Sequence, residues 1–251
     1  MSVAIYEETK KDIDEAYRNK NTSKIEKETS FILNQLIVTM TNHFQDRLNR
    51  ITIGRLDFKK PYIFSNKNWQ SLSSWLNRFQ ELAFPISDLE FGKLKIDFEY
   101  WYYEIGGKEV TFEYRESYLL KPSEASEQLG ISTVTLNKYI KQGFECVDTR
   151  SHHKIPKHAV EVFKDPVYAI KMQMLAQKKK IENQSPEERI IEINEELLEF
   201  QKKYKKKSWK EAFNGYEVNV MDDPSEYYEW RDLEEEKESL ITKLIEDNNH
   251  E

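Results

Sequence analysis

Apolar residues in the first 50 positions recur with the period of a helix. After the turn-like segment Asn19–Ser23, apolar side chains return mostly every fourth residue, which places them on one helix face. They are Ile25, Ile32, Leu36, Met40 and Phe44, with Leu33, Ile37 and Leu48 widening the stripe. A shorter face precedes the turn at Ile5, Ile13, Ala16 and Tyr17. The pattern predicts two helices that serve a core or a dimer contact.

The apolar period changes in residues 51–117. Ile51–Phe58 alternates between apolar and polar residues like a strand. A helix is expected to begin at Ser65 or Asn66, with Trp69, Leu72, Leu76, Phe79 and Leu82 inward, and to stop at Phe84-Pro85. Segments Leu94–Ile105 and Val110–Tyr114 flank Gly106-Gly107, a strong turn signal, and therefore predict a β-hairpin.

Tyr118–Asp165 predicts two short helices with a tight glycine turn between them. Pro122-Ser123 is a helix start, and Gly130 stands where a terminal glycine ends a helix. Ser132 then begins a second helix, whose buried stripe is Leu136 and Ile140 and whose end is Gly143. This order is a helix-turn-helix.

A small two-stranded wing is expected to follow this pair of helices. Phe144–Thr149 alternates apolar and polar residues, Arg150–His152 is the tip, and Lys154-Ile155 returns. Pro156 then opens a third helix, which carries Ala159, Val160 and Phe163.

This order of elements resembles the excisionase-like branch of the MerR winged-helix superfamily. The matching positions are Pro122-Ser123-Glu124-Ala125, Leu129-Gly130-Ile131-Ser132, Thr135-Leu136, Tyr139-Ile140, Gly143 and Ser151–Pro156. The resemblance covers less than a fifth of the chain and implies a DNA-binding module. Members of the family usually carry basic residues early in the second helix, where this chain has Thr133 and Val134. We expect that this departure weakens the grip on phosphates and makes dimerisation more necessary.

The residues expected to contact double-stranded DNA lie on the second helix and on the wing. In a helix-turn-helix, the beginning of the second helix enters the major groove, where Asn pairs with adenine and Lys takes guanine or a phosphate. The candidates are Ser132, Thr133, Val134, Thr135, Asn137, Lys138 and Lys141, and on the wing Arg150, His152, His153 and Lys154. The alternative is a winged helix that contacts only proteins.

The last 70 residues predict two amphipathic helices. Ser185 and Pro186 begin a helix with Ile190, Ile193, Leu197, Phe200 and Tyr204 on one apolar seam. A second helix begins at Asp223-Pro224-Ser225 and carries Trp230, Leu233, Leu240 and Leu244. Because an acidic spacer separates them, we expect that the two seams cannot cover each other well and that they fold on a partner.

The order of these elements looks like the C-terminal arm of small prokaryotic antitoxins. The resemblance rests on Phe200, Lys203-Tyr204, Ser208–Phe213 and Tyr227–Trp230, although Lys205 stands where that pattern has Gly. It implies a toxin-binding arm whose contact residues are Leu197, Phe200, Tyr204, Trp209, Phe213, Tyr228 and Trp230. The alternative is a self-associating helical hairpin that dimerises the DNA-binding module.

Positive and negative charges are distributed unevenly along the chain, in a way that suits two different partners. The formal net charge is −7, but Lys121–Lys180 has eleven Lys/Arg against six Asp/Glu, and Ile181–Glu251 has ten against twenty-one. A basic middle suits DNA, and an acidic tail suits a small basic toxin. One cysteine, a polar N-terminus and no long apolar run lead us to expect a cytoplasmic chain without disulfides or membrane contact.

Catalytic and metal-binding motifs are absent from the sequence. It has no phosphate loop, no nucleophile motif and no paired Cys/His cluster, and His43 is alone on its helix. We therefore expect no enzyme activity, no cofactor and no metal. A nuclease-like alternative would need Asp57, Asp97, Glu99 and Glu113 to converge, and a ligand-sensing alternative would use Tyr100, Trp101, Tyr102 and Tyr103.

The predicted fold class is α+β and mostly helical. It comprises an N-terminal α+β domain at 1–117 (helices plus a β-hairpin) that is a candidate for dimerisation, a winged helix-turn-helix at 118–181 and an acidic helical arm at 182–251. The expected function is that of a homodimeric transcriptional regulator, specifically an antitoxin that represses its operon and neutralises a toxin through its C-terminal helices. The alternative is a phage or mobile-element regulator without a toxin partner.

Overall fold

A computed structural model describes residues 3–81, 85–148, 153–214 and 224–248. The chain forms two compact units, residues 1–179 and 180–251. The structure is mostly helical with a few short antiparallel strands, as expected for the fold class. The segments 1–117 and 118–181 were expected as separate domains, but the first unit contains all of 1–117 together with 118–179.

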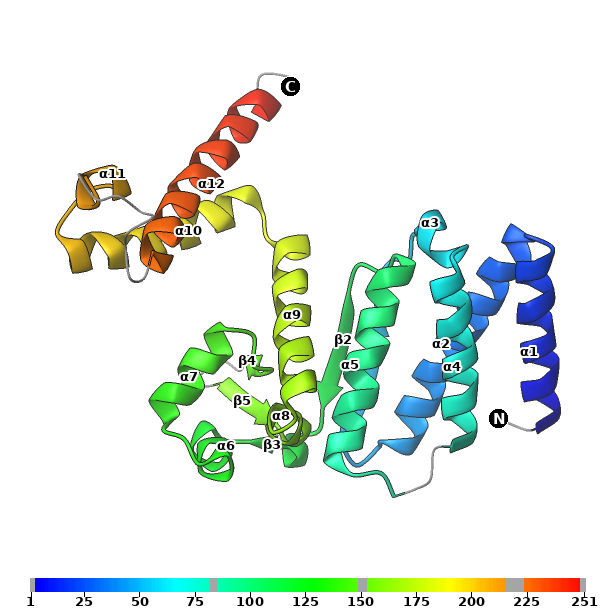
Figure 1. The fold of residues 1–251 in the computed structure, drawn as a ribbon. Helices are drawn as coiled ribbons and strands as arrows, with labels where there is room; N and C mark the ends of the chain where they lie inside the picture. The colour runs from blue at the N-terminus through cyan, green and yellow to red at the C-terminus, as the bar shows by residue number, and fades with distance from the viewer. Residues whose placement is uncertain (1–2, 82–84, 149–152, 215–223, 249–251) are drawn as a thin grey trace. The chain divides into compact units, whose positions relative to one another are not determined.

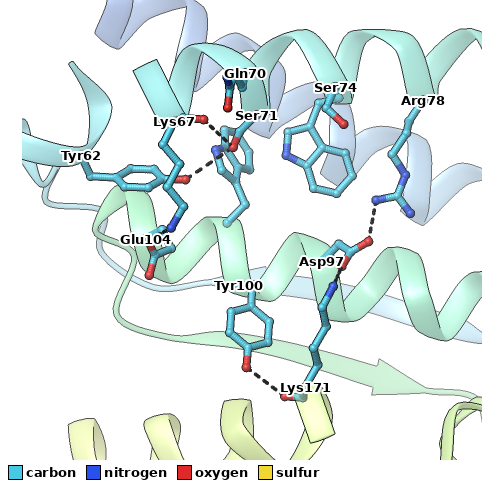
Figure 2. Close-up of a pocket in the computed structure, with 12 residues that line it drawn as sticks. Tyr62, Lys67, Gln70, Ser71, Ser74, Arg78, Asp97, Tyr100, Glu104 and Lys171 are labelled. Carbon is cyan, nitrogen blue, oxygen red and sulfur yellow. Dashed lines mark hydrogen bonds and ion pairs between the residues drawn. The ribbon is translucent and has the colours of Figure 1, made fainter. Parts of the chain in front are cut away.

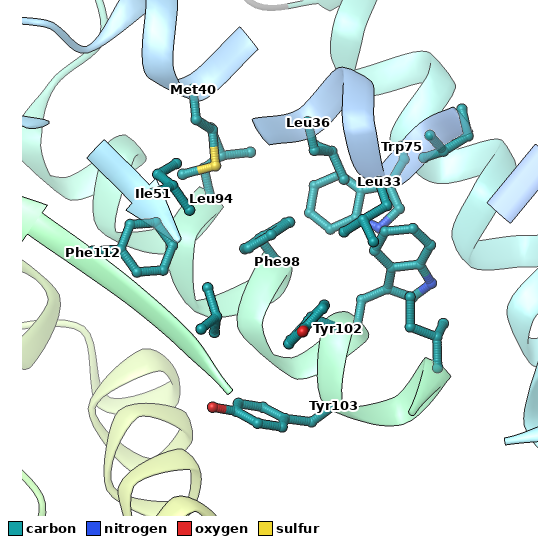
Figure 3. Packing of buried hydrophobic residues seen from close by; sticks show 14 of the residues in the cluster. Leu33, Leu36, Met40, Ile51, Trp75, Leu94, Phe98, Tyr102, Tyr103 and Phe112 are labelled. Carbon is teal, nitrogen blue, oxygen red and sulfur yellow. The ribbon is translucent and has the colours of Figure 1, made fainter. Parts of the chain in front are cut away.

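The N-terminal part of the first unit is built around the long helix α5 (Figure 1). Its elements are α1 (Val3–Arg18), α2 (Thr22–His43), β1 (Leu48–Ile53), α3 (Lys60–Ile63), α4 (Asn66–Glu81), α5 (Asp88–Ile105) and β2 (Val110–Tyr114). The apolar stripe of α2 is buried against this helix, and Figure 3 shows Leu33, Leu36 and Met40 of α2 around Phe98 and Tyr102 of α5. The two N-terminal helices and the helix after Ser65 are therefore confirmed, but Phe44 and Leu48, expected on the second helix, follow its end, and Leu48 begins β1. Leu82 and Phe84 lie outside the described residues.

The strand predicted at Leu94–Ile105 is wrong, because this segment is helical. Ser87 caps the helix by accepting a hydrogen bond from the Glu90 N–H, and Gly106, at φ 112°, ends it. Eleven of its residues are buried, which reflects a helix enclosed by protein on several sides and not a half-exposed sheet. Alternation of aromatic and charged residues was therefore a misleading signal, and Gly106 serves as a helix cap.

The strand β2 pairs instead with a segment far away in sequence. It lies antiparallel to β1, with Ile51 opposite Phe112. The predicted strand Ile51–Phe58 is shifted, since the regular part ends at Ile53 and only Leu56 makes a further bridge, to Gly107.

The central segment contains the two predicted short helices with a glycine turn, followed by a two-stranded hairpin. The first strand of this hairpin, predicted at Phe144–Thr149, covers only Val147–Asp148 in the described residues. Its elements are a 3-10 turn η1 (Glu116–Tyr118), β3 (Leu119–Leu120), α6 (Pro122–Leu129), α7 (Thr133–Lys141), β4 (Val147–Asp148), β5 (His153–Pro156), α8 (Lys157–Phe163) and α9 (Pro166–Asn183). The strands form one sheet in the order β3-β5-β4. Gly130 ends α6 in the left-handed conformation, at φ 67°, as the sequence indicated.

A second apolar core lies beneath the helix-turn-helix and is continuous with α5. It is formed by Ile96, Leu120, Ala125, Leu136, Phe144, Ile155, Ala159, Val160, Val162 and Met172. Helices α5 and α8 approach so closely that a Cβ on Gly92 would stand 2.3 Å from the Cγ2 of Val162. The contact fixes the helix-turn-helix on the N-terminal part.

The second unit comprises α10 (Pro186–Tyr204), α11 (Trp209–Ala212) and α12 (Ser225–Asn248). Ser185 caps α10 and Pro186 is its first residue, as predicted. The apolar faces of α10 and α12 pack against each other, with a small core of Ile193, Leu197, Phe213, Trp230 and Leu233. The expectation that the two seams cannot cover each other is therefore wrong.

Candidate nucleic-acid interface

The helix α7 presents one polar, exposed face to solvent. The buried side chain of Leu136 anchors the helix, and the Oγ of Ser132 caps it by accepting a hydrogen bond from the Thr135 N–H over 3.1 Å. The opposite face carries Thr133, Val134, Asn137, Lys138 and Lys141, all exposed. These positions recur at intervals of three and four, so that their side chains share one surface.

The side chains on this face are available to a ligand. Within the described residues, neither Lys138 nor Lys141 makes an ion pair, and Asn137 makes no side-chain hydrogen bond. Val134 is 78% exposed, which is the largest exposed fraction of any large apolar side chain in the described part of the chain. A bidentate amide, two cations and an apolar side chain are the groups with which a helix reads the major groove.

The wing residues are only partly described. Arg150 and His152, both expected to contact DNA, lie outside the described residues. The Nδ1 of His153 hydrogen-bonds to Asp148, and Lys154 pairs with the carboxylate of Glu116. To bind a DNA phosphate, each of these two side chains must therefore first release its carboxylate partner.

A buried charged cluster, which was not predicted from the sequence, links α5 to the residues that directly precede β4. Lys95 and Glu99 of α5 are 3% and 1% exposed. The Nζ of Lys95 lies 2.9 Å from Glu99 and 3.0 Å from Glu145, which directly precedes the wing. The same Glu145 oxygen lies 3.1 Å from the Nε2 of His158, and its other oxygen accepts a hydrogen bond of 2.6 Å from Tyr114.

The electrostatics of this cluster follow from its pairing. Burial alone would raise the pKa of the Glu145 carboxyl, but Lys95 and then His158 hold that pKa well below its ordinary value. Burial alone would lower the pKa of Lys95, but Glu145 and Glu99 raise it. Both groups are therefore charged at neutral pH, and the cluster ties α5, β2 and α8 to the base of the wing.

A pocket of about 550 Å³ lies between α4 and α5 (Figure 2). Tyr100 and Trp101 line it, whereas Tyr102 and Tyr103 are buried in the core. Its charged groups already pair with each other: Arg78 and Lys171 bind the two oxygens of Asp97 over 2.9 and 3.1 Å. The pocket therefore offers aromatic edges but little free charge.

The four carboxylates of the nuclease-like alternative do not converge. Asp97 pairs with Arg78 and Lys171, while Glu99 is buried with Lys95. Asp57 pairs with Arg55, and Glu113 pairs with Arg50. In the described part of the chain, no cluster of metal-ligating side chains includes any of the four.

The aromatic residues expected to bind a toxin mostly pack within the C-terminal unit. Leu197, Phe213 and Trp230 are buried there. Phe200 stacks on Trp230 with 5.4 Å between ring centroids, Tyr204 packs on Phe213, and Trp209 packs on Tyr227. Of the seven candidates, Tyr228 has an exposed side chain.

Comparisons of this chain with protein-family models, curated proteins and solved structures found no significant match. None of the helices in the described ranges combines the length and apolar character needed to cross a bilayer.

Proposed function

We propose that this protein is a sequence-specific DNA-binding transcriptional regulator. The observation that carries the proposal is the exposed face of α7, where Asn137, Lys138 and Lys141 have no partner in the described part of the chain. This face belongs to the second, capped helix of the helix-turn-helix, and the hairpin that follows bears His153 and Lys154 on its second strand. In the proposed complex, α7 enters the major groove, and the wing binds phosphates or a minor groove.

The proposal is tested by selecting from a randomised duplex library with purified full-length protein. Binding of the enriched duplex and of a scrambled duplex is then followed by fluorescence anisotropy at several salt concentrations. A recurring motif supports the proposal. Equal affinity for both duplexes at every salt concentration contradicts it, because base contacts would then be missing.

We infer that two copies of the chain bind two half-sites. Few cations on α7 face the ligand, so one module neutralises few phosphates. Helix α9 carries three exposed apolar side chains at 167, 170 and 174, which lie on one helix face: Val167, Ile170 and Met174 are 61%, 58% and 57% exposed. This face is the proposed contact between two copies of the chain.

We further propose that the C-terminal unit binds a small basic toxin, as an antitoxin arm does. The unit is strongly acidic, and apolar side chains remain exposed outside its own core: Ile191 and Leu198 on α10 and Ile241 and Ile245 on α12. Most of the aromatic residues predicted to contact the toxin pack inside the unit and stabilise its fold. Tyr228 is exposed and belongs with the four exposed apolar residues on the proposed binding surface.

Capture from lysate of the native host, with the full-length protein as bait, tests the antitoxin role. Specific recovery of a small basic protein encoded by the adjacent gene supports it, provided that Ile191→Glu with Leu198→Glu prevents recovery. Recovery of the bait protein alone contradicts it and leaves the alternative, a phage or mobile-element regulator whose arm serves self-association.

A further inference from the structure

Three side chains with different metal-binding atoms meet at the base of the wing. The Sγ of Cys146, a carboxylate oxygen of Asp148 and a ring nitrogen of His153 all lie within 4.8 Å of one another. Across the described ranges, this is the one group of three or more such side chains brought so close. A thiolate, a carboxylate and an imidazole are donors that Zn²⁺ accepts, with water at the fourth position.

The backbone of the hairpin creates this arrangement. Asp148 of β4 and His153 of β5 are directly opposite each other in the antiparallel ladder. Cys146 precedes Asp148 by two residues and therefore lies on the same side of the chain. The neighbouring Phe144 and Ile155 are buried, so the apolar core holds the two chain segments in place.

The donors also have the accessibility that a metal ion requires. The side chains of Asp148 and His153 are 80% and 50% exposed, so an ion can reach them and both side chains can turn. Around a zinc ion, bonds of about 2.0 Å to nitrogen or oxygen and about 2.3 Å to sulfur place the donors roughly 3.5 Å apart. The hydrogen-bonded atoms of Asp148 and His153, which are 2.5 Å apart, must therefore separate as the pair turns toward the Sγ of Cys146. Rotation of the two exposed side chains supplies this movement, while the half-buried Cys146 stays fixed.

We propose that Cys146, Asp148 and His153 bind one zinc ion at the base of the wing. The ion links β4 to β5 on either side of the segment 149–152 and so stiffens the hairpin. The site extends the proposed function beyond DNA recognition, and its test needs no DNA. The paired carboxylate–imidazole contact alone would be an ordinary surface ion pair; the thiol adds the third donor.

Cobalt titration of the full-length, tag-free and reduced protein tests the site, because Co²⁺ reports its ligands in its absorption spectrum. The expected result is a thiolate-to-cobalt charge-transfer band in the near ultraviolet, together with visible bands of a four-coordinate ion. Both saturate at one equivalent and disappear when Zn²⁺ is added. Cys146→Ser removes the near-ultraviolet band, and Asp148→Asn and His153→Gln each weaken Co²⁺ binding by about tenfold or more.

His43→Gln is the matched control, since His43 lies on α2, and it leaves the titration unchanged. The two exposed wing positions are suitable for substitution without unfolding, which circular dichroism verifies. Absence of the near-ultraviolet band in the wild-type protein overturns the proposal. Wild-type affinity in both Asp148→Asn and His153→Gln also overturns it, because the cobalt would then bind to an isolated thiol.

Discussion

The Nζ of Lys95 on α5 lies 3.0 Å from the carboxylate of Glu145, and this ion pair joins the N-terminal part of the first unit to the base of the wing. Lys95 is 3% exposed, so it cannot exchange a lost partner for water. Glu145→Ala removes one of its two carboxylate partners and also the partner of His158 Nε2. We expect a loss of about 3 kcal/mol in the free energy of unfolding, measured by urea titration.

Glu127→Ala on the exposed surface of α6 is the control and changes the free energy by less than about 0.5 kcal/mol. A loss below about 1 kcal/mol for Glu145→Ala would contradict the buried linkage.

Close packing of α5 on α8 predicts that Gly92→Ala destabilises the first unit. The new Cβ would meet the Cγ2 of Val162 at 2.3 Å, and we expect a loss of about 1–3 kcal/mol in the free energy of unfolding. Val162→Ala opens space at the same point. In the double variant the two effects are therefore less than additive, and a double-mutant cycle measured by urea unfolding reveals the coupling; strict additivity would argue against the contact.

Two substitutions separate base recognition from phosphate binding on α7. Asn137→Ala costs about 1–3 kcal/mol on the selected duplex and leaves the scrambled duplex unaffected, so base preference relaxes. Lys138→Ala and, on the wing, Lys154→Ala weaken binding to all sequences and reduce the salt dependence. Anisotropy titrations measure both. Equal losses on both duplexes for Asn137→Ala would exclude its position in the groove.

The ion pair between Lys154 and Glu116 gives a further result for the wing. The carboxylate of Glu116 pairs with the ammonium group of Lys154, which a DNA phosphate would otherwise bind. Glu116→Gln is therefore expected to strengthen DNA binding and to steepen its salt dependence. Exposed Glu127→Gln is charge-matched and serves as the control. An unchanged affinity in Glu116→Gln, measured beside that control, would show that Lys154 does not contact DNA.

Dimerisation through α9 predicts a change in molecular mass. Ile170→Glu places a charge in the centre of the exposed apolar face and converts the protein to a monomer in light-scattering measurements. Thr111→Glu, at an exposed position on β2, adds the same charge elsewhere and leaves the mass unchanged. If Ile170→Glu keeps the wild-type mass, the contact lies on another surface.

The stability of the C-terminal unit depends on pH through Glu192. Partial burial alone would raise its pKa, but hydrogen bonds from Lys180, Gln184 and Arg189 lower the pKa from 4.5 to about 2. The ionised carboxylate therefore stabilises the unit above about pH 4.5, and this stabilisation is lost as the pH falls towards 2. After solvent screening, its contribution to the free energy of unfolding is of the order of 1 kcal/mol. Urea unfolding at pH 5 and pH 3 shows a smaller pH effect in Glu192→Gln than in wild type; equal effects would contradict this assignment.

The local signals in the sequence were sufficient for the helix-turn-helix. Gly130 and Ser132 act through their own backbone neighbours, so their meaning did not depend on distant contacts. The same holds for Ser185 and Pro186 at the start of α10. Caps and glycine turns are local, and this explains why these boundaries were predictable.

Long-range contacts explain the errors. Helix α5 is enclosed by protein, so its apolar residues lack a single helical stripe, and period-two alternation indicated a strand. Glu145 lies 50 positions from Lys95, and no local pattern connects them. By contrast, Cys146 and Asp148 stand two apart in a predicted strand and His153 directly precedes the predicted return at Lys154-Ile155, so this spacing contained a signal for the cluster at the wing.

Sequence-specific recognition by α7 is tested by selection from a randomised duplex library with wild-type protein and with the double variant Asn137→Ala, Lys138→Ala. We expect the wild type to enrich one motif, repeated in two half-sites, and the folded double variant to enrich none. Failure of the folded wild-type protein to enrich any motif would contradict sequence-specific DNA recognition by α7, as would enrichment of the same motif by the double variant.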